Sequence, residues 1–128
     1  MNIKKFIFLL CISFSSNVFA LSRIISVDIS YTGKDLLTQS LEKELRAKIS
    51  HSRDFTMSSN QRSDLQLLIA ENIKVKVVAN HNQLSYKVNF ISQQKILSVS
   101  AGSCWQDQLY ECADQILRDA KITISQNP

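Results

Sequence analysis

The chain has 128 residues, with 15 Lys and Arg against 11 Asp and Glu and a hydrophobic content of 45%. This length suits a single domain, and the apolar content is too high for a disordered polypeptide. The formal charge of +4 comes without a cluster of Lys and Arg, so a nucleic-acid partner is not expected.

The amino-terminal segment has the pattern of a cleaved secretory signal. Met1–Lys5 is basic, Phe6–Ile12 is apolar, and Val18-Phe19-Ala20 places small or modest side chains where a signal peptidase cuts. The apolar run is too short to span a bilayer, which needs about 20 apolar residues. We therefore expect Met1–Ala20 to be removed and Leu21–Pro128 to be one exported α/β domain, periplasmic or secreted, with no membrane span.

Export changes both the charge and the cysteine count. Removing the signal leaves 108 of the 128 residues and takes away Lys4 and Lys5, so the formal charge falls from +4 to +2. Cys11 leaves with the signal. A lipid anchor at Cys11 would need a small residue before the cysteine, where Leu10 stands, so such an anchor is not expected.

The remaining cysteines, Cys104 and Cys112, predict one disulfide, because an even count in an oxidising compartment usually pairs. Two residues eight apart in one helix are about 12 Å apart, whereas a disulfide needs Cα atoms within roughly 7 Å. We therefore expect Cys104 to lie outside the helix that carries Cys112. The alternative is two buried free thiols, and without a C-x-x-C motif thiol catalysis is not expected.

The first half of the mature chain alternates between strand and helix patterns. Apolar residues at every second position predict a strand over Arg23–Ser30, and apolar residues at every fourth position predict an amphipathic helix over Lys34–Ser50. Asp54–Ser58 is a short predicted strand. A long predicted strand over Leu65–Val77 follows, with a bend or bulge where Glu71-Asn72 interrupts its pattern.

Two more alternating segments, Leu84–Phe90 and Ile96–Ala101, predict strands that complete an antiparallel meander. In the second, we expect Leu97 and Val99 to face the core and Ser98 to face solvent. The last element is predicted to be a helix with an apolar face from Leu109 to Ala120. Ile122–Ser125 could extend that helix or form a short strand.

These elements follow in the order β-α-β-β-β-β-α. Each helix has a single apolar stripe, so the two helices can cover only one side of a sheet. The sequence therefore predicts an α+β fold, a two-layer sandwich of a mostly antiparallel sheet with two helices on one face.

The other sheet face is expected to be polar and available to a partner. It would carry Asp28, Gln66, Lys74, Lys76, Lys87, Asn89 and Ser98. The candidate partner-binding residues among these are Lys74, Lys76, Lys87 and Asn89. The alternative is a solvated face whose lysines discourage aggregation. An exposed sheet edge would also allow a homodimer or the addition of a strand from another protein.

The order of elements resembles that of small periplasmic α/β domains, such as the amino-terminal domain of TolB, CsgG and LpoB. The resemblance covers most of the mature chain and is architectural. The features that carry it are Ile24–Ser30, Gly33, Leu37, Leu41, Leu45, Phe55, Ser63-Asp64-Leu65, the meander and Ala113–Ala120. It implies a domain that docks on envelope proteins and is not an enzyme. The chain departs from those proteins in lacking a lipobox cysteine, a fused propeller and a clear membrane-inserting segment.

Patterns that carry catalysis are missing from the sequence. His51 and His81 lie in predicted polar turns, and no serine lies in a G-x-S-x-G elbow. Neither H-x-x-x-H nor C-x-x-C occurs, so no metal site is expected, and two isolated glycines cannot form a phosphate-binding loop. We therefore expect no enzymatic activity, no metal and no cofactor.

The first functional hypothesis is a non-enzymatic periplasmic protein-binding module that docks on a cell-envelope component. The alternative is a periplasmic immunity or inhibitor protein against a toxin or a hydrolase, which would share the size, the disulfide and the export signal. A third hypothesis, a small exported hydrolase, would require His51 or His81 for its activity.

Overall fold

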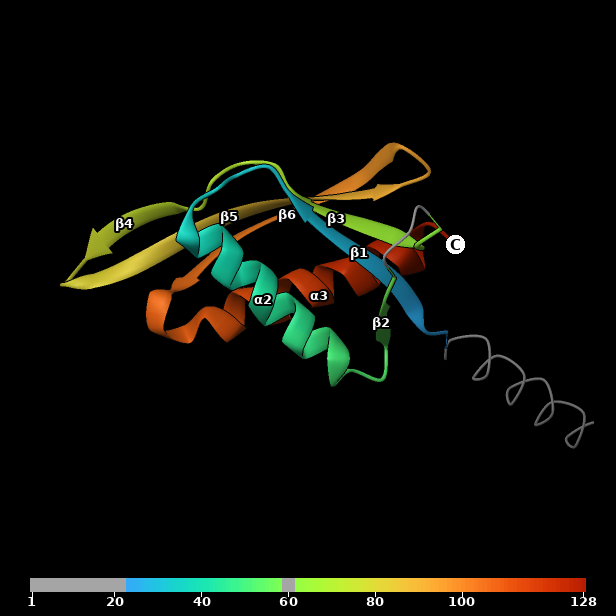
Figure 1. The fold of residues 1–128 in the computed structure, drawn as a ribbon, viewed down its shortest axis with the longest axis horizontal. Helices are drawn as coiled ribbons and strands as arrows, with labels where there is room; N and C mark the ends of the chain where they lie inside the picture. The colour runs from blue at the N-terminus through green and yellow to red at the C-terminus, as the bar shows by residue number, and fades with distance from the viewer. Residues whose placement is uncertain (1–22, 59–61) are drawn as a thin grey trace, which may run out of the picture.

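The computed structural model describes residues 23–58 and 62–128. The predicted signal, Met1–Ala20, lies outside these residues. Along the chain (Figure 1), the elements are β1 (Ile25–Tyr31), α2 (Leu36–Ser50), β2 (Phe55–Met57), β3 (Leu65–Ile69), β4 (Lys74–Val78), β5 (His81–Ser92), β6 (Lys95–Trp105), the 3-10 turn η1 (Gln106–Gln108) and α3 (Leu109–Gln126).

The strands form one mixed sheet with both helices on the same face, which confirms the predicted α+β class (Figure 1). β5 pairs antiparallel with β3, β4 and β6, so the predicted meander is present. β1 instead pairs parallel with β2 and β3. Parallel neighbours arise because α2 carries the chain back along the sheet before β2 begins.

The long strand predicted over residues 65–77 is divided into β3 and β4. Leu68 of β3 pairs with Asn89, and Lys74 of β4 pairs with Ser85. The chain therefore advances six residues from Leu68 to Lys74, while the opposite strand, β5, advances only four. The two extra residues form an irregularity at the predicted Glu71-Asn72 interruption. Both β3 and β4 lie on one edge of β5, because β6 pairs along the other edge.

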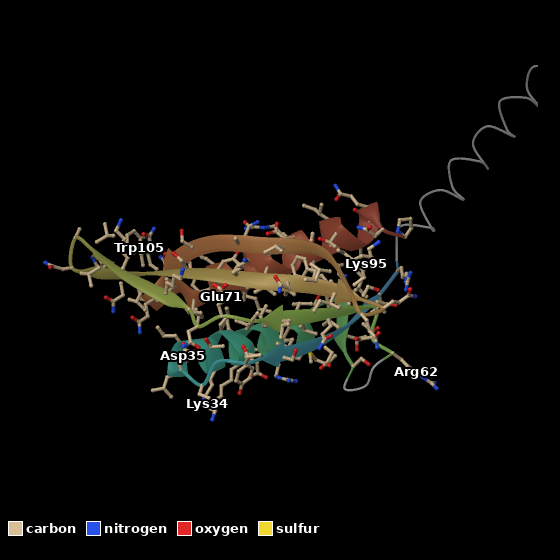
Figure 2. All side chains as sticks on the ribbon, turned by 90° about the horizontal axis from the view of Figure 1, so that it is seen from above. Lys34, Asp35, Arg62, Glu71, Lys95 and Trp105 are labelled. Carbon is tan, nitrogen blue, oxygen red and sulfur yellow. A yellow bond between two sulfur atoms is a disulfide. The ribbon has the colours of Figure 1, made fainter. Side chains whose placement is uncertain are left out.

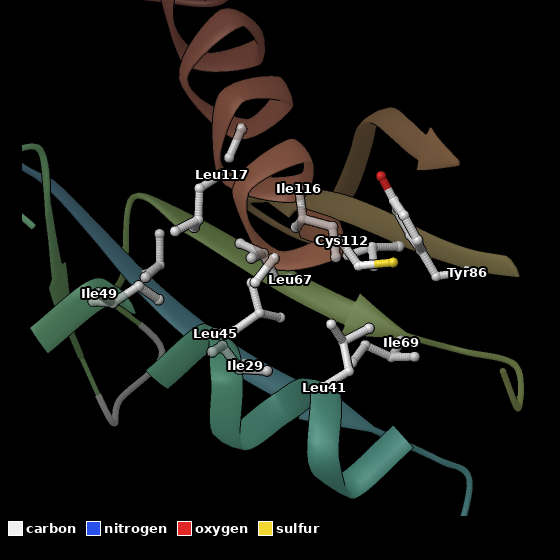
Figure 3. Close-up of a cluster of buried hydrophobic side chains, with 14 of the residues drawn as sticks. Ile29, Leu41, Leu45, Ile49, Leu67, Ile69, Tyr86, Cys112, Ile116 and Leu117 are labelled. Atoms are coloured by element: carbon white, nitrogen blue, oxygen red, sulfur yellow. The ribbon is translucent and has the colours of Figure 1, made fainter. Parts of the chain in front are cut away.

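The core lies between the helices and the inner face of the sheet. α2 begins after Asp35, whose carboxylate accepts hydrogen bonds from the Thr38 N–H at 3.1 Å and the Thr38 hydroxyl at 2.6 Å. Leu41, Leu45 and Ile49 then recur at helical spacing and are buried. Figure 3 shows this stripe packed toward β1, β3 and α3. Burial of each such side chain stabilises the fold by roughly 1.5–3 kcal/mol.

A disulfide joins α3 to β6. The Cα atoms of Cys104 in β6 and Cys112 in α3 are 5.6 Å apart. This confirms the predicted bond and the expectation that Cys104 lies outside the helix of Cys112. α3 continues to Gln126, so Ile122–Ser125 extends the helix.

The side chains of β6 alternate in the opposite sense from the prediction. Cys104 faces α3 to form its disulfide, so the two-residue period of a strand turns Ser100 and Ser98 toward α3 as well. Val99 points away from the core and is 47% exposed. The expectation that Ser98 lies on the open face and Val99 in the core is therefore wrong.

Leu97 packs on the core side despite this reversed alternation, because β6 has a bulge there. Phe90 pairs with Ser98, whereas the next residue of β5, Ile91, pairs with Ile96. Leu97 is therefore one extra residue on β6, and it packs against the core cluster as predicted.

Asp64 joins the start of β3 to β1. Its carboxylate accepts hydrogen bonds from the Ser26 N–H at 3.0 Å and from Arg23 at 2.6 Å, while the Asp64 N–H donates to the Ser26 hydroxyl at 2.8 Å. Burial alone would raise the pKa of Asp64, but the Ser26 hydrogen bonds and the Arg23 charge together hold that pKa below its ordinary value. The carboxylate therefore stays charged at neutral pH and strengthens this link between the two strands.

Replacing Cys104 and Cys112 together by alanine should lower the free energy of unfolding by about 2.5 kcal/mol, the loop-closure entropy of a link eight residues apart. Urea denaturation of the oxidised and variant proteins measures the difference. The wild-type chain in excess reductant is the control and should show a similar loss. Equal stability of the oxidised and reduced wild-type chains would contradict the prediction.

Both tight hairpins place non-glycine residues at positive φ. Ala79 and Asn80 join β4 to β5 with φ of 51° and 64°, and Gln93 and Gln94 join β5 to β6 with φ of 52° and 64°. Two positive φ values in a two-residue loop are the type I′ pattern, which favours Asn followed by Gly. Glutamine carries a steric cost in this region that glycine does not.

The double substitution Gln93→Asn and Gln94→Gly should raise the free energy of unfolding by about 1 kcal/mol, because it relieves strain that the turn imposes. Thermal and urea denaturation measure the gain. Gln94→Ala is the matched control, since it removes the same side chain but keeps a Cβ at positive φ, and it should give no gain. A stabilisation of the control as large as that of the double variant would show that backbone strain is not the cause.

Candidate interaction face of the sheet

The sheet face opposite the helices, here called the open face, carries the four predicted partner-binding residues. On β5, Tyr86 and Val88 face the core, so Lys87 and Asn89 face away from it. Paired residues of antiparallel strands share a face, so Lys74 lies on the open face with its partner Ser85. Lys76 follows two residues later on the same face. Figure 2 looks down on this face, with both helices behind it.

Lys74, Lys76 and Lys87, here called the lysine patch, are exposed at the β4 side of the open face. Lys74 and Lys87 line a small cavity of about 150 Å³, where the irregularity between β3 and β4 leaves β5 partly uncovered. Glu71 lines the same cavity. The three lysines form no ion pair among residues 23–58 and 62–128, so their charges remain available to an acidic partner.

Apolar side chains occupy the β6 side of the open face, which the sequence had indicated would be polar. Ile96 is 56% exposed and Val99 is 47% exposed. Leu68 of β3 and Ile91 of β5 are half-buried on the same face. Ile91 pairs with Ile96, and Leu68 lies across Asn89 from Val99, since both pair with Asn89. These four residues are called the apolar strip.

The cysteine pair in the sequence predicts that Val99 of the apolar strip is exposed, whereas the alternation of apolar and polar residues in β6 does not. A disulfide to the final helix requires Cys104 to face that helix, and counting back in steps of two places Val99 on the opposite face. The apparent amphipathic alternation of β6 is therefore misleading, because the serines serve as buried hydrogen-bonding groups.

A polar layer lies beneath β6 where an apolar core was expected. The Ser100 hydroxyl donates to the Asp119 carboxylate at 2.6 Å, and the hydroxyls of Ser98 and Thr123 are 2.7 Å apart. Gln115 donates to the other Asp119 oxygen at 2.9 Å. These bonds satisfy polar groups that α3 and β6 bury between them.

Tyr86 is the exception in this layer. It is 5% exposed, and its hydroxyl makes no hydrogen bond of good geometry with the described residues, although Ser100 and Asp119 are its neighbours. Burial raises the pKa of Tyr86; the nearby Asp119 carboxylate raises it further, whereas Ser100 opposes the rise. The ring packs over Gly102, where an added Cβ would lie 2.8 Å from the Tyr86 hydroxyl. A side chain at position 102 would therefore force the Tyr86 ring to shift.

The two histidines are not brought together. His51 follows α2, where its Nδ1 lies 2.9 Å from the Ala47 carbonyl oxygen. His81 begins β5, and its ring forms a T-shaped pair with the Trp105 ring, with centroids 6.1 Å apart. The two histidines line different cavities, His51 one beside α3 and His81 one beside Gln106 and Asp107.

An open cavity of about 500 Å³ lies between the carboxyl-terminal end of α2 and α3, with His51 in its lining. Ion pairs cross it, from Lys48 to Asp114 at 2.8 Å and from Lys121 to Asp54 at 3.2 Å. These charges neutralise one another. In the described part of the chain no group of three or more His, Cys, Asp or Glu residues could hold a metal ion, and none of its helices is long and apolar enough to cross a membrane.

Comparison with known proteins identifies the fold but not the family. No protein-family model and no curated protein matches the chain. A DUF330-family protein from Xanthomonas campestris is similar in structure, with a TM-score of 0.63 at 10% identity over 83% of this chain and 89% of that one. A minor lipoprotein from Acinetobacter baumannii has a TM-score of 0.52 at 12% identity over 78% of this chain and 92% of that one. The chain shares its fold with these two proteins. The specific resemblance to TolB, CsgG and LpoB stays a prediction.

Replacing Tyr86 by phenylalanine should raise the free energy of unfolding by about 1 kcal/mol, because it removes a buried hydroxyl that lacks a hydrogen bond and keeps the ring over Gly102. Urea denaturation measures the change. Tyr86→Leu is the control. It removes the aromatic ring as well as the hydroxyl, so it should destabilise the protein. A loss of stability in Tyr86→Phe would show that the hydroxyl contributes a favourable interaction.

Proposed function

We propose that the chain is a non-enzymatic, exported binding module that docks on a protein of the cell envelope through the open face of its sheet. The observation that carries this proposal is the composition of that face. The exposed lysine patch lies beside the apolar strip, and no element among residues 23–58 and 62–128 covers either of them.

The arrangement fits a protein partner better than a small molecule. Exposed apolar patches with a polar surround mark protein interaction sites, whereas small-molecule sites are concave and enclosed. Ile96 and Val99 would supply the dry centre of an interface, and the lysine patch would supply its charged rim. A complementary partner would present an apolar surface beside acidic side chains.

Two further features support an exported protein. The predicted signal over Met1–Ala20 would direct the chain out of the cytoplasm, and the disulfide between Cys104 and Cys112 is of the kind that persists in an oxidising compartment. His51 and His81 line different cavities, which supports a role without catalysis, because neither is placed to act as the acid or base for the other.

In-cell crosslinking of the tagged chain, followed by mass spectrometry of the envelope fraction, tests the proposal. A partner captured by the wild-type chain should be captured roughly tenfold less by the triple variant Lys74→Gln, Lys76→Gln and Lys87→Gln, because three favourable charge interactions are lost. The matched control neutralises two exposed lysines on the helical side, Lys34 and Lys43, which form no ion pair among the described residues, and it should leave capture unchanged.

The outcomes separate the competing functions. An envelope protein whose capture depends on the lysine patch supports docking, whereas a toxin or hydrolase captured in the same way would instead favour an inhibitor. Capture of this chain alone, or equal losses in the test and control variants, would overturn the docking proposal.

A further inference from the structure

Among the described residues the sheet has three edge strands, β2, β4 and β6, and the first two are protected. β2 is only three residues long, and β4 carries the exposed Lys74 and Lys76. Short length and lysine side chains are two devices by which proteins prevent an edge strand from pairing with another chain.

The third edge, β6, lacks these devices. It is 11 residues long, and β5 pairs along only one of its sides; no other described strand pairs with it. The chain from Ile96 to Gln106 contains no charged residue and no proline. Its one irregularity is the bulge at Leu97, which leaves the stretch from Ser98 to Trp105 regular. An edge of this kind is a template for strand addition.

Exposed apolar side chains flank this edge in both layers. Ile96 and Val99 lie on the open face, and Ile122 of α3 is 54% exposed on the helical side. Residues three apart on a helix share a flank, so Ile122 lies on the same flank as Asp119, which accepts a hydrogen bond from Ser100 of β6. Ile122 therefore lies beside the free edge, away from the α2 side of α3.

The charges at the two ends of β6 indicate which strand pairs there. Lys95 begins β6 and Asp107 lies just beyond its end, and neither forms an ion pair among the described residues. Figure 2 shows Lys95 and Trp105, the two ends of the strand, far apart across the sheet. The free edge thus has a positive and a negative end, which is complementary to its own antiparallel copy.

We propose that the occupant is a second copy of this chain, whose β6 pairs antiparallel with the first to form a two-fold dimer. Lys95 and Asp107 lie at opposite ends of β6 on either side of Ala101, so a two-fold axis near Ala101 brings the Lys95 end of one subunit close to the Asp107 end of the partner subunit, twice. Parallel pairing would instead place like charges together. The stretch around Ala101 has no charged residue or proline to oppose backbone pairing, and the exposed Val99 of each subunit lies near the axis.

The oligomeric state of the purified exported chain, measured by sedimentation velocity and light scattering over a series of concentrations, tests the proposal. The wild-type chain should form a dimer. Lys95→Glu and Asp107→Lys should each weaken it roughly tenfold, because each reversal turns two attractive pairs into repulsive ones. The double variant Lys95→Glu with Asp107→Lys should restore the wild-type dissociation constant. Lys43→Glu on the exposed side of α2 is the matched control and should have no effect.

A second variant keeps the test independent of the charges. Val99→Lys adds a charge beside the free edge without filling the core, and it should produce a folded monomer, as judged by circular dichroism. A wild-type chain that stays monomeric at every concentration would overturn the dimer, as would a dimer that ignores both the single reversals and Val99→Lys. The dimer does not rest on the envelope partner, so either of these results would leave the docking proposal to be decided by crosslinking.

Discussion

The disulfide between Cys104 and Cys112 is the constraint on which the outer half of the structure depends. It holds α3 against β6 and determines which way each side chain of that strand faces. Since side chains alternate along a strand, one inward-facing cysteine turns Ser100 inward and Val99 outward. β6, whose inward side chains include Ser98 and Ser100, is held to α3 by this covalent bond and by hydrogen bonds to Asp119 and Thr123.

This inversion links the interior of the protein to its surface. An apolar residue in place of Ser98 or Ser100 would pack against α3, but the hydrogen-bonding partners on α3 would then be left without a bond, which is costly in a buried layer. The apolar residues displaced from the interior of β6 appear instead on the open face, next to the lysine patch on β4 and β5. One side of the sheet thus combines exposed charge and exposed apolar area, a composition that suits a surface covered by another protein.

Much of the fold follows from the sequence because local pattern and packing agree there. The stripe of Leu41, Leu45 and Ile49 predicts α2, and strict alternation predicts β1 and β5. The interruption at Glu71-Asn72 correctly marks the irregularity between β3 and β4. The parallel pairing of β1 with β2 and β3 could not be read in this way, because strand order depends on contacts between distant segments.

The candidate site, like the fold, was predicted from the sequence only in part. The sequence alone predicted the disulfide pair, and it placed Lys74, Lys76, Lys87 and Asn89 on one face, because cysteine count and strand period are local properties. The tertiary structure decided that Ser98 bonds to Thr123 beneath the sheet and that no other strand of the described residues pairs with the outer side of β6. It also showed that Val99 is exposed, which the alternation of β6 had hidden. Hydrophobicity indicates that a strand has two different faces, but which face is buried depends on the element that packs against it.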